Sequence, residues 1–521
     1  MTDLQENAAG HTLKLPVVST ASVLLGFTLL QLVAFLNAGV FEYPLDDVYI
    51  HLAISEQIAH GGYGVNSGEY ASAASSPLYP VFLILFAGAE AQRFLPLIWN
   101  IVALTACGWL WGRILSQAGY ETASRSFGIF AAAVVPLLIN LPGIAYTGME
   151  HTLHTAASLA IVLGLLILLD EDRLTFLLPL GIVLGPAIRF EALGLSLLAA
   201  GVLVLRRRSA AGIASGATAL LVIVGFMVFL VSLGLEPLPS SVQAKLGMNE
   251  SSTPAGGIIG NVLEMASHPN GAILFSILLS SIVFLVVAVM EPGRDVGPYR
   301  WLLAVIVCAL VAHIMVGKVG WMNRYENYIV VSATAISLAF AVRGSVVWRL
   351  VALVPIFVAT VVYGAHHIST YPYATRTIDR QQAQLARLAQ DFVRGPVAVT
   401  DLGRVAWGNS HYVLDLWGLG SLEALRLRQE GAPPGWGGPL AARHDVELAM
   451  IFEPWMKSAA APDWVRLGTL GIDGSFRYSL MPEVVIVATS SDAAVRLRET
   501  VTDWAAGLPE GAWFHPASAD L

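Results

Sequence analysis

Two adjacent aspartates, Asp46 and Asp47, lie in a long polar stretch of an otherwise apolar half of the chain. They stand where a loop passes into a helix, and Asp47 is suited to cap a helix that lies on a membrane surface. The apolar positions of that helix would be Val48, Leu52, Ile54 and Ile58. Two carboxylates held close together and shielded from bulk water could instead supply a general base for a hydroxyl group. The residues alone leave both interpretations open.

Further ionisable residues stand at the ends of apolar segments. Glu150 ends the sequence GME, and Arg189 and Glu191 separate two short apolar segments. Charged groups so close to hydrocarbon are costly, so a functional role with a defined partner is the default hypothesis. The simpler alternative is that Arg189 pairs with Glu191 or with Glu150. His151 and His154 share one helix face, but two histidines are too few ligands for a zinc site.

Three cations lie in two other polar loops, Lys245 in GLEPLPSSVQAKLG, and Lys318 and Arg324 in GKVGWMNRYENY. Lysine binds phosphate as a point charge and arginine binds it as a planar fork, so a phosphate group is their natural partner. Alternatively, these cations pair with the carboxylates named above. Both interpretations can hold if the cations pair with the carboxylates when no phosphate ligand is bound.

The elements that must position these residues are membrane spans. Of the 521 residues, 56% are apolar and only 13% are charged, which excludes a soluble enzyme because too few polar groups remain to cover its surface. A span needs about 20 mostly apolar residues. Eleven candidate segments lie at residues 18–40, 94–116, 126–146, 152–170, 174–188, 192–205, 212–234, 271–290, 301–317, 327–342 and 350–366. The stretch 77–88 is shorter and contains Pro80, so we expect an interfacial or re-entrant segment there.

The charges in the loops predict how the spans are oriented. Arginine and lysine are concentrated in alternate loops, which the positive-inside rule assigns to the cytoplasm. These residues are Lys14, Arg113, Arg125, Arg173, Arg206, Arg207, Arg208, Arg294, Arg300, Arg343 and Arg349. The polar residues described above all fall in the opposite, outer set of loops, and an odd number of spans brings the C-terminal region to that outer face.

The chain therefore divides into a membrane module, residues 1–366, and a soluble region, residues 367–521. The first outer loop is at 41–92. We predict that the soluble region is a small α/β domain. Its expected helices are 375–394 and 491–506, and its expected strands are 397–400, 412–416 and 483–489. Five tryptophans of this region could stack on sugar rings, but a place in the core is the preferred interpretation: Trp407, Trp417, Trp436, Trp455 and Trp464.

Composition also limits the partners. The net charge is −8, and no Lys/Arg cluster is interleaved with aromatic residues, so nucleic acid is not expected as a partner. The lipid bilayer is an expected partner. The only two cysteines, Cys107 and Cys308, lie in apolar segments and are expected to pack rather than to form a disulfide.

Taken in order, the outer motifs resemble the GT-C superfamily of membrane glycosyltransferases. The segment DDVYIHLAISEQIAHGGYGVNSGEY, followed by SSPLYP, is similar to the first outer loop of the bacterial branch that contains actinobacterial terminal arabinofuranosyltransferases. The other similar motifs are GME ending at Glu150, the Arg189 to Glu191 cluster, the segment 239–245 and the pair Arg324 and Tyr325. Residues 397–420 (VAVTDLGRVAWGNSHYVLDLWGLG) resemble the start of the soluble outer domain attached to many such enzymes.

This resemblance implies an inverting glycosyltransferase in the bacterial inner (cytoplasmic) membrane, with its active site and C-terminal domain outside the cytoplasm. Such an enzyme would move a pentofuranose such as arabinose, or a hexose such as mannose, from a polyprenyl-phosphate carrier. The acceptor would be a hydroxyl of a cell-envelope glycan or glycolipid. In the family one aspartate of the pair is the base, and its place in the motif assigns that role to Asp46, with Asp47 orienting the loop or a bound cation.

The resemblance also implies roles for the remaining polar residues. Lys245 and Arg324, with Arg189 as a third choice, would neutralise the leaving phosphate. The residues that would organise these cations or contact the acceptor are Glu150, Glu191, His51 and Tyr325. Some relatives use a divalent ion, and the oxygen ligands of Asp46 and Asp47 would suit Mg²⁺, Mn²⁺ or Ca²⁺. The sequence identifies no certain cofactor and leaves open whether such an ion is bound.

Two other classes of protein remain open. A membrane transporter or lipid flippase could use the outward charges as an ion or substrate path, and it would place buried charges near the middle of the bilayer. A non-catalytic membrane scaffold could bind glycan through its C-terminal domain.

Overall fold

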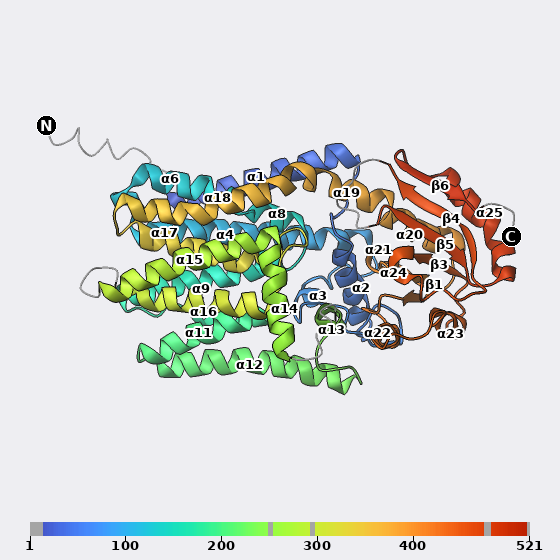
Figure 1. Cartoon of the computed structure of the whole chain (residues 1–521), viewed down its shortest axis with the longest axis horizontal. Helices are drawn as coiled ribbons and strands as arrows, with labels where there is room; N and C mark the ends of the chain where they lie inside the picture. Colours follow the sequence, from blue (N-terminus) through green and yellow to red (C-terminus); the bar gives the residue numbers. More distant parts are fainter. Residues whose placement is uncertain (1–13, 248–253, 292–296, 474–480, 518–521) are drawn as a thin grey trace.

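In a computed structural model, the chain forms a bundle of long helices with a smaller, sheet-containing domain at one end (Figure 1). The structure describes residues 14–247, 254–291, 297–473 and 481–517. The long helices run along the longest dimension of the molecule, and the C-terminal domain covers one end of the bundle. The chain is therefore a polytopic helical protein with a C-terminal α/β domain, as the sequence predicts.

Eight helical segments among the described residues are long and apolar enough to cross a membrane. They are Leu15–Ala38 (α1), Glu90–Ala118 (η2, Glu90–Phe94, and α4, Leu95–Ala118), Arg125–Tyr146 (α6, Arg125–Ala133; α7, Val135–Leu138; α8, Leu141–Tyr146), His151–Glu171 (α9), Ser209–Ser232 (α12), Pro269–Met290 (α15), Tyr299–Val316 (α16) and Val346–Val393, which begins with α18 (Val346–Ser369). Pro136 and Pro142 lack the backbone donor that a helix interior needs, so the third segment is divided into short pieces. The four-residue helix α5 (Tyr120–Ala123) lies between α4 and α6.

Three shorter apolar helices complete the bundle: α10 (Leu177–Ile188), α11 (Ala192–Leu205) and α17 (Asn327–Ala341). At 1.5 Å per residue they are about 18 to 22 Å long, shorter than the hydrocarbon core of a bilayer. All residues of α17 are buried inside the bundle. The eleven predicted segments are thus all helical, whereas the stretch 77–88 forms only α3 (Tyr79–Phe82) and turns.

The segments between the bundle and the C-terminal domain are short. Figure 1 shows α2 (Asp47–Ala59), α13 (Ser240–Gly247) and α14 (Pro254–Ser267) at this end of the bundle. Most of the charged side chains at this end of the bundle come from loops and helix ends. This arrangement concentrates polar groups where the backbone itself leaves donors and acceptors unpaired.

The helix expected after the aspartate pair is found as α2, which runs across the ends of the long helices (Figure 1). Its residues from Val48 to Ser55 are buried, and the helix packs against α21 (Gly403–Ala406) of the C-terminal domain. Its N-cap residue is Asp46 rather than Asp47, and the side chain of Asp46 makes no capping hydrogen bond to α2. Besides α21, α2 contacts α3 of the first loop, and both carboxylates are used in other contacts.

The C-terminal domain begins where α18 leads into α19 (Tyr371–Arg380), α20 (Gln382–Arg387) and the π-helix η3 (Leu388–Val393). Its six-stranded sheet has the order β2-β1-β3-β5-β4-β6. The strands are β1 (Val397–Val399), β2 (Val413–Asp415), β3 (Leu448–Ile451), β4 (Val465–Ile472), β5 (Glu483–Ala488) and β6 (Ala512–Pro516). β2, β1 and β3 are parallel, with Ala398 opposite Leu414 and Ala449, and the other pairs are antiparallel.

Helices surround the sheet of this domain: α22 (Leu422–Gln429), α23 (Gly437–Arg443), α24 (Glu453–Met456) and α25 (Ser491–Ala506). The predicted strands near 397, 412 and 483 and the predicted helix at 491–506 are found as β1, β2, β5 and α25. Trp407 and Trp436 are buried, as expected of core residues, whereas Trp455 is 38% exposed.

Candidate functional site

Most of the charged residues singled out in the sequence meet at the domain end of the bundle. Asp47 opens α2, Glu150 precedes α9, Arg189 follows α10, Glu191 precedes α11 and Tyr325 lies before α17. Segments far apart in the sequence therefore contribute to one site. We call it the charged cluster, and its members are Asp47, His51, Glu150, Arg189, Glu191, Arg324 and Tyr325.

Arg189 joins two carboxylates of the charged cluster. Its Nη1 lies 2.5 Å from Oε1 of Glu150, and its Nη2 lies 2.6 Å from Oε1 of Glu191. Burial opposes charge on Glu150 and on Arg189, but their attraction outweighs it, so the pKa of Glu150 is lowered and the pKa of Arg189 is raised. Both groups stay ionised, and the simpler interpretation that Arg189 pairs with these carboxylates is confirmed.

Arg324 approaches the cluster from the opposite loop. Its Nη2 forms an ion pair with Oδ2 of Asp47, and the two side chains are 2% and 35% exposed, so solvent reaches the carboxylate but not the guanidinium. Nε and Nη1 of Arg324 are buried and have no hydrogen-bond partner within the described part of the chain. Buried donors are normally satisfied, so this guanidinium is suited to bind a further anionic oxygen.

Tyr325 contacts both guanidinium groups. The Cζ atom of Arg324 lies 5.1 Å from the centre of the tyrosine ring, and the Cζ atom of Arg189 lies 5.8 Å from it. Both distances are typical of cation–π contacts. The ring therefore holds two positive charges near each other that would otherwise repel.

The loop before Arg324 has a strained backbone. Four successive residues have positive φ: Gly320 (84°), Trp321 (51°), Met322 (61°) and Asn323 (60°). Left-handed geometry costs a non-glycine residue about 1–2 kcal/mol. Such strain persists only where other contacts enforce it, and it is concentrated at functional sites.

Buried polar contacts hold this loop in place. Nδ2 of Asn270 donates to Oδ1 of Asn323 at 2.8 Å and to Oε1 of Glu326 at 2.6 Å. Oε2 of Glu326 accepts the backbone N–H of Gly320 at 2.9 Å, and Nδ2 of Asn323 donates to the Tyr371 hydroxyl at 3.1 Å. No local pattern in the sequence connects Asn270, Asn323, Glu326 and Tyr371, because they lie far apart in the chain, so their shared role is visible only in the structure.

His51 lies on α2 facing Glu150. Its Nε2 is 3.6 Å from Oε2 of Glu150, and burial lowers the pKa of the imidazole. Its Nδ1 is buried and has no hydrogen-bond partner among the described residues. The hydroxyl of Ser75 donates to Oε1 of Glu150 at 2.8 Å. A neutral histidine therefore lines the cluster beside a charged carboxylate.

Asp46 points away from the charged cluster and into the C-terminal domain. Its Oδ2 accepts the backbone N–H of Gly403 at 2.5 Å, and its Oδ1 accepts that of Arg404 at 2.7 Å. It also shares a side-chain hydrogen bond with Asp401, and burial, followed by the nearby charge of Asp401, raises the pKa of Asp46 well above its ordinary value. Both oxygens of Asp46 are thus committed to the start of α21.

Other contacts join the first loop to the C-terminal domain. Glu42 lies 3.2 Å from Nη2 of Arg93 and 3.6 Å from Nε of Arg404. Nε1 of Trp407 donates to Oε1 of Gln92 at 2.9 Å. In an open α/β sheet, ligands usually bind at the carboxyl ends of the parallel strands. In this protein, the segment after β1 instead binds the side chain of Asp46 from the membrane module.

The remaining predicted residues lie elsewhere. Lys245 is on α13, and its side chain lies outside the described part of the structure. Lys318 lies 3.2 Å from Oε2 of Glu264. His154 stacks on Tyr328, with ring centres 4.1 Å apart, rather than joining His151 at a metal.

A shared divalent ion does not fit Asp46 and Asp47. The backbone of Gly403 and Arg404 occupies the oxygens of Asp46, while Asp47 pairs with Arg324. Among the residues that the structure describes, no group of three or more His, Cys, Asp or Glu side chains could hold a metal. The chemistry of the cluster is therefore that of carboxylates facing guanidinium groups.

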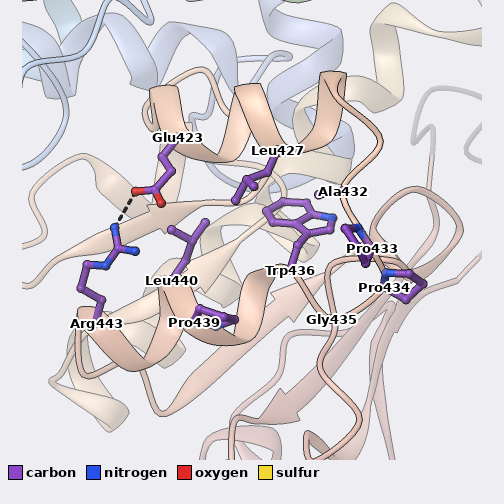
Figure 2. A pocket seen from close by; sticks show the side chains of 10 residues that line it. All are labelled: Glu423, Leu427, Ala432, Pro433, Pro434, Gly435, Trp436, Pro439, Leu440 and Arg443. Atoms are coloured by element: carbon purple, nitrogen blue, oxygen red, sulfur yellow. Dashed lines mark hydrogen bonds and ion pairs between the residues drawn. The ribbon is translucent and has the colours of Figure 1, made fainter.

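A hollow of about 340 Å³ lies on the C-terminal domain between α22 and α23 (Figure 2). Its lining is mostly apolar, and Figure 2 shows the indole of Trp436 beside Leu427 and Pro433. Its charged pair, Glu423 and Arg443, is bonded together at 2.6 Å. Trp436 is only 8% exposed, so its ring packs in the domain core and is not an open stacking platform.

Fold and site define this chain as a multi-pass helical membrane protein whose C-terminal α/β domain covers a buried cluster of arginines and carboxylates. Residues 375–495 match a family described as "Domain of unknown function (DUF8728)". No curated protein matches the chain. Two crystal structures of ArnT from Cupriavidus metallidurans are similar at 12% sequence identity, one in the apo state and one bound to undecaprenyl phosphate. Their TM-scores are 0.35 and 0.36, and each match covers 91% of this chain and 99% of that chain.

Proposed function

We propose that this protein is an inverting glycosyltransferase that uses a polyprenyl-phosphate sugar as donor. The observation that carries the proposal is Arg324, a buried guanidinium with two unsatisfied donors, set against the half-exposed carboxylate of Asp47. An anion-binding group and a potential base therefore face each other at the end of an apolar bundle, where a lipid phosphate and a polar acceptor can meet.

The reaction can be written with these groups. The acceptor hydroxyl oxygen attacks the anomeric carbon from the face opposite the phosphate, and its proton passes to Asp47. The bond between the anomeric carbon and the phosphate oxygen breaks, and its electron pair leaves with the polyprenyl phosphate. Arg324 stabilises the charge that develops on that phosphate, a contribution that is often the largest in such reactions.

The geometry favours Asp47 over Asp46 as the base. Asp46 is 6% exposed and accepts two backbone N–H groups from the C-terminal domain, whereas the side chain of Asp47 is 35% exposed and faces Arg324. We therefore assign Asp46 to positioning. Glu150 and Glu191 hold Arg189, and Lys245 remains a proposed second ligand of the donor phosphate.

The finer assignments are also proposals. The sugar is a pentofuranose such as arabinose or a hexose such as mannose, the acceptor is a cell-envelope glycan or glycolipid, and the reaction takes place on the outer face of a bacterial cytoplasmic membrane. A transporter is disfavoured because members of the charged cluster stand at helix ends on one side of the bundle.

The test is a transfer assay with the purified full-length protein. It is incubated with polyprenyl-phosphate arabinose and polyprenyl-phosphate mannose, each with radiolabelled sugar, and with membrane glycan acceptors. We expect label to move from the carrier to an acceptor for at least one donor, with inversion at the anomeric carbon. Transfer with retention, or no transfer with any donor and acceptor, would overturn the proposal.

A further inference from the structure

A second pocket lies where the first loop meets the C-terminal domain, and its lining differs from that of the charged cluster. It has a volume of about 210 Å³ and is lined on one side by the end of α2 and the turn after it, and on the other by the segment before β2. The polar groups that line it include Gln57, Ser67, Asn409, Ser410 and Tyr412. No Asp, Glu, Lys or Arg is among the lining residues.

The chemistry of this lining selects a neutral, hydroxyl-rich ligand. Carboxamides and hydroxyl groups each donate and accept hydrogen bonds, as sugar hydroxyls do. A phosphate or a carboxylate would find no lysine or arginine there, and His411 is the one lining residue that can carry a positive charge. The volume corresponds to roughly seven water molecules at about 30 Å³ each, room for one sugar ring.

Asn409 supplies a donor that the protein leaves unsatisfied. Its Oδ1 accepts the backbone N–H of His411 at 2.9 Å, which fixes the orientation of the carboxamide. Its Nδ2 is buried and has no hydrogen-bond partner within the described residues. A buried donor without a partner is unfavourable, so a ligand hydroxyl that reaches this atom would stabilise the complex.

The two walls of the pocket are held together before any ligand binds. Asn66 is 6% exposed, its Oδ1 accepts the N–H of Val413 at 2.8 Å, and its Nδ2 donates to the Val413 carbonyl at 3.0 Å. A side chain of the first loop thus covers the edge of β2, an outer strand of the sheet. A preformed pocket loses less entropy on binding than one that must assemble.

We propose that this pocket binds a sugar residue of the acceptor glycan, remote from the residue that reacts. This inference rests on the proposed function for the identity of the ligand as an acceptor. Asp47 and Gln57 are the first and eleventh residues of the same helix, α2 (Asp47–Ala59), so they lie about 15 Å apart along its axis. An acceptor that reaches both sites must contain several sugar residues.

The test uses the full-length protein in detergent with two probes, an arabinofuranose tetrasaccharide and a mannose tetrasaccharide. Ser410 is exposed at the pocket, so Ser410→Trp fills the space without cutting a core contact. The matched control is Ser491→Trp, an exposed serine at the start of α25 on the far side of the domain. Thermal unfolding checks that both variants fold.

Binding is measured by saturation-transfer-difference NMR. The wild type and Ser491→Trp should bind at least one tetrasaccharide, and Ser410→Trp should bind it at least about tenfold more weakly, the loss expected for one or two hydrogen bonds. Equal binding by all three proteins, or no binding by the wild type, would overturn the inference.

Transfer kinetics separate this inference from the proposed function. In Ser410→Trp the ratio of kcat/KM for the tetrasaccharide to kcat/KM for a monosaccharide acceptor should fall at least about tenfold. An unchanged ratio with active transfer would refute the subsite and leave the transferase standing. A third outcome is that Ser410→Trp loses glycan binding while none of the three proteins transfers sugar. That result would refute the proposed transferase activity and the identity of the ligand as its acceptor. The pocket would then be a glycan-binding site with another function.

Discussion

At the scale of single residues, Arg324 carries the proposed chemistry. Substituting Arg324→Gln removes its charge and its ion pair with Asp47, so we expect kcat for sugar transfer to fall about 10²- to 10³-fold, as when a single charge-stabilising donor is lost. Arg324→Lys keeps a charge without the planar fork and should recover only part of the rate. Steady-state kinetics with labelled donor provide the measurement.

Lys318 offers a matched control on the same loop, since its ammonium group pairs with Glu264. Lys318→Gln should retain wild-type kcat. If Arg324→Gln also turned over within twofold of the wild type, Arg324 would not bind the leaving group.

Site residues could be predicted from the sequence only where their residue type stands out from the surrounding residues. Glu150, Arg189 and Arg324 stand out in the sequence because charges are scarce in apolar surroundings, and the structure brings them together. Asp46 and Asp47 are adjacent, so the sequence could not say which one faces the site. Their different orientations follow from where α2 begins and from the docking of α21, which are properties of the tertiary structure.

At the scale of elements, the contact between α2 and α21 decides how the C-terminal domain is held. An added Cβ at Gly403 would lie 2.1 Å from the backbone oxygen of Asp46. Gly403→Ala should therefore destabilise the docked domain by about 1–3 kcal/mol, the usual cost of overpacking, and lower the Tm measured in detergent.

Gly395→Ala serves as the comparison for this substitution. The nearest atom to a Cβ at Gly395 is 3.8 Å away, an ordinary contact, so its Tm should stay close to that of the wild type. Equal Tm values for Gly403→Ala and the wild type would show that the domain is not fastened through Asp46.

Elements were predictable where length and hydropathy identify them. The eleven apolar segments are helices because a long apolar run can satisfy its backbone in no other way inside a membrane. β3, β4 and β6 escaped prediction, and a short run such as LAMI (β3) lacks the alternation that identifies a strand. β3 is recognisable only through its pairing with β1 and β5.

At the scale of the whole molecule, the two parts of the chain meet at a pair of buried carboxyl groups, which we expect to share a proton. Asp46 and Asp401 are both buried, and burial raises the pKa of each. Because the folded protein holds this proton more tightly than the unfolded chain, its contribution to stability is complete below about pH 4 and is lost as the pH rises through the raised pKa.

We therefore expect the Tm of the wild type to fall more steeply from about pH 4 to about pH 8 than the Tm of Asp401→Asn, which keeps a hydrogen-bonding group but cannot ionise. Asp415, whose pKa burial raises to about 6, titrates in both proteins and cancels in the comparison. Parallel curves of Tm against pH would rule out the shared proton.

The most direct measurement of the central claim is sugar transfer by the wild type, Asp47→Asn and Asp46→Asn under identical conditions. Asp47→Asn should have a lower Tm, because it loses the ion pair with buried Arg324, but at a temperature where it is still folded it should lose about 10²- to 10⁴-fold in kcat, as expected when a general base is removed. Asp46→Asn should lose stability first, because its oxygens hold α21. Full activity in Asp47→Asn, with the loss of turnover confined to a fully folded Asp46→Asn, would contradict the assignment of Asp47 as the base.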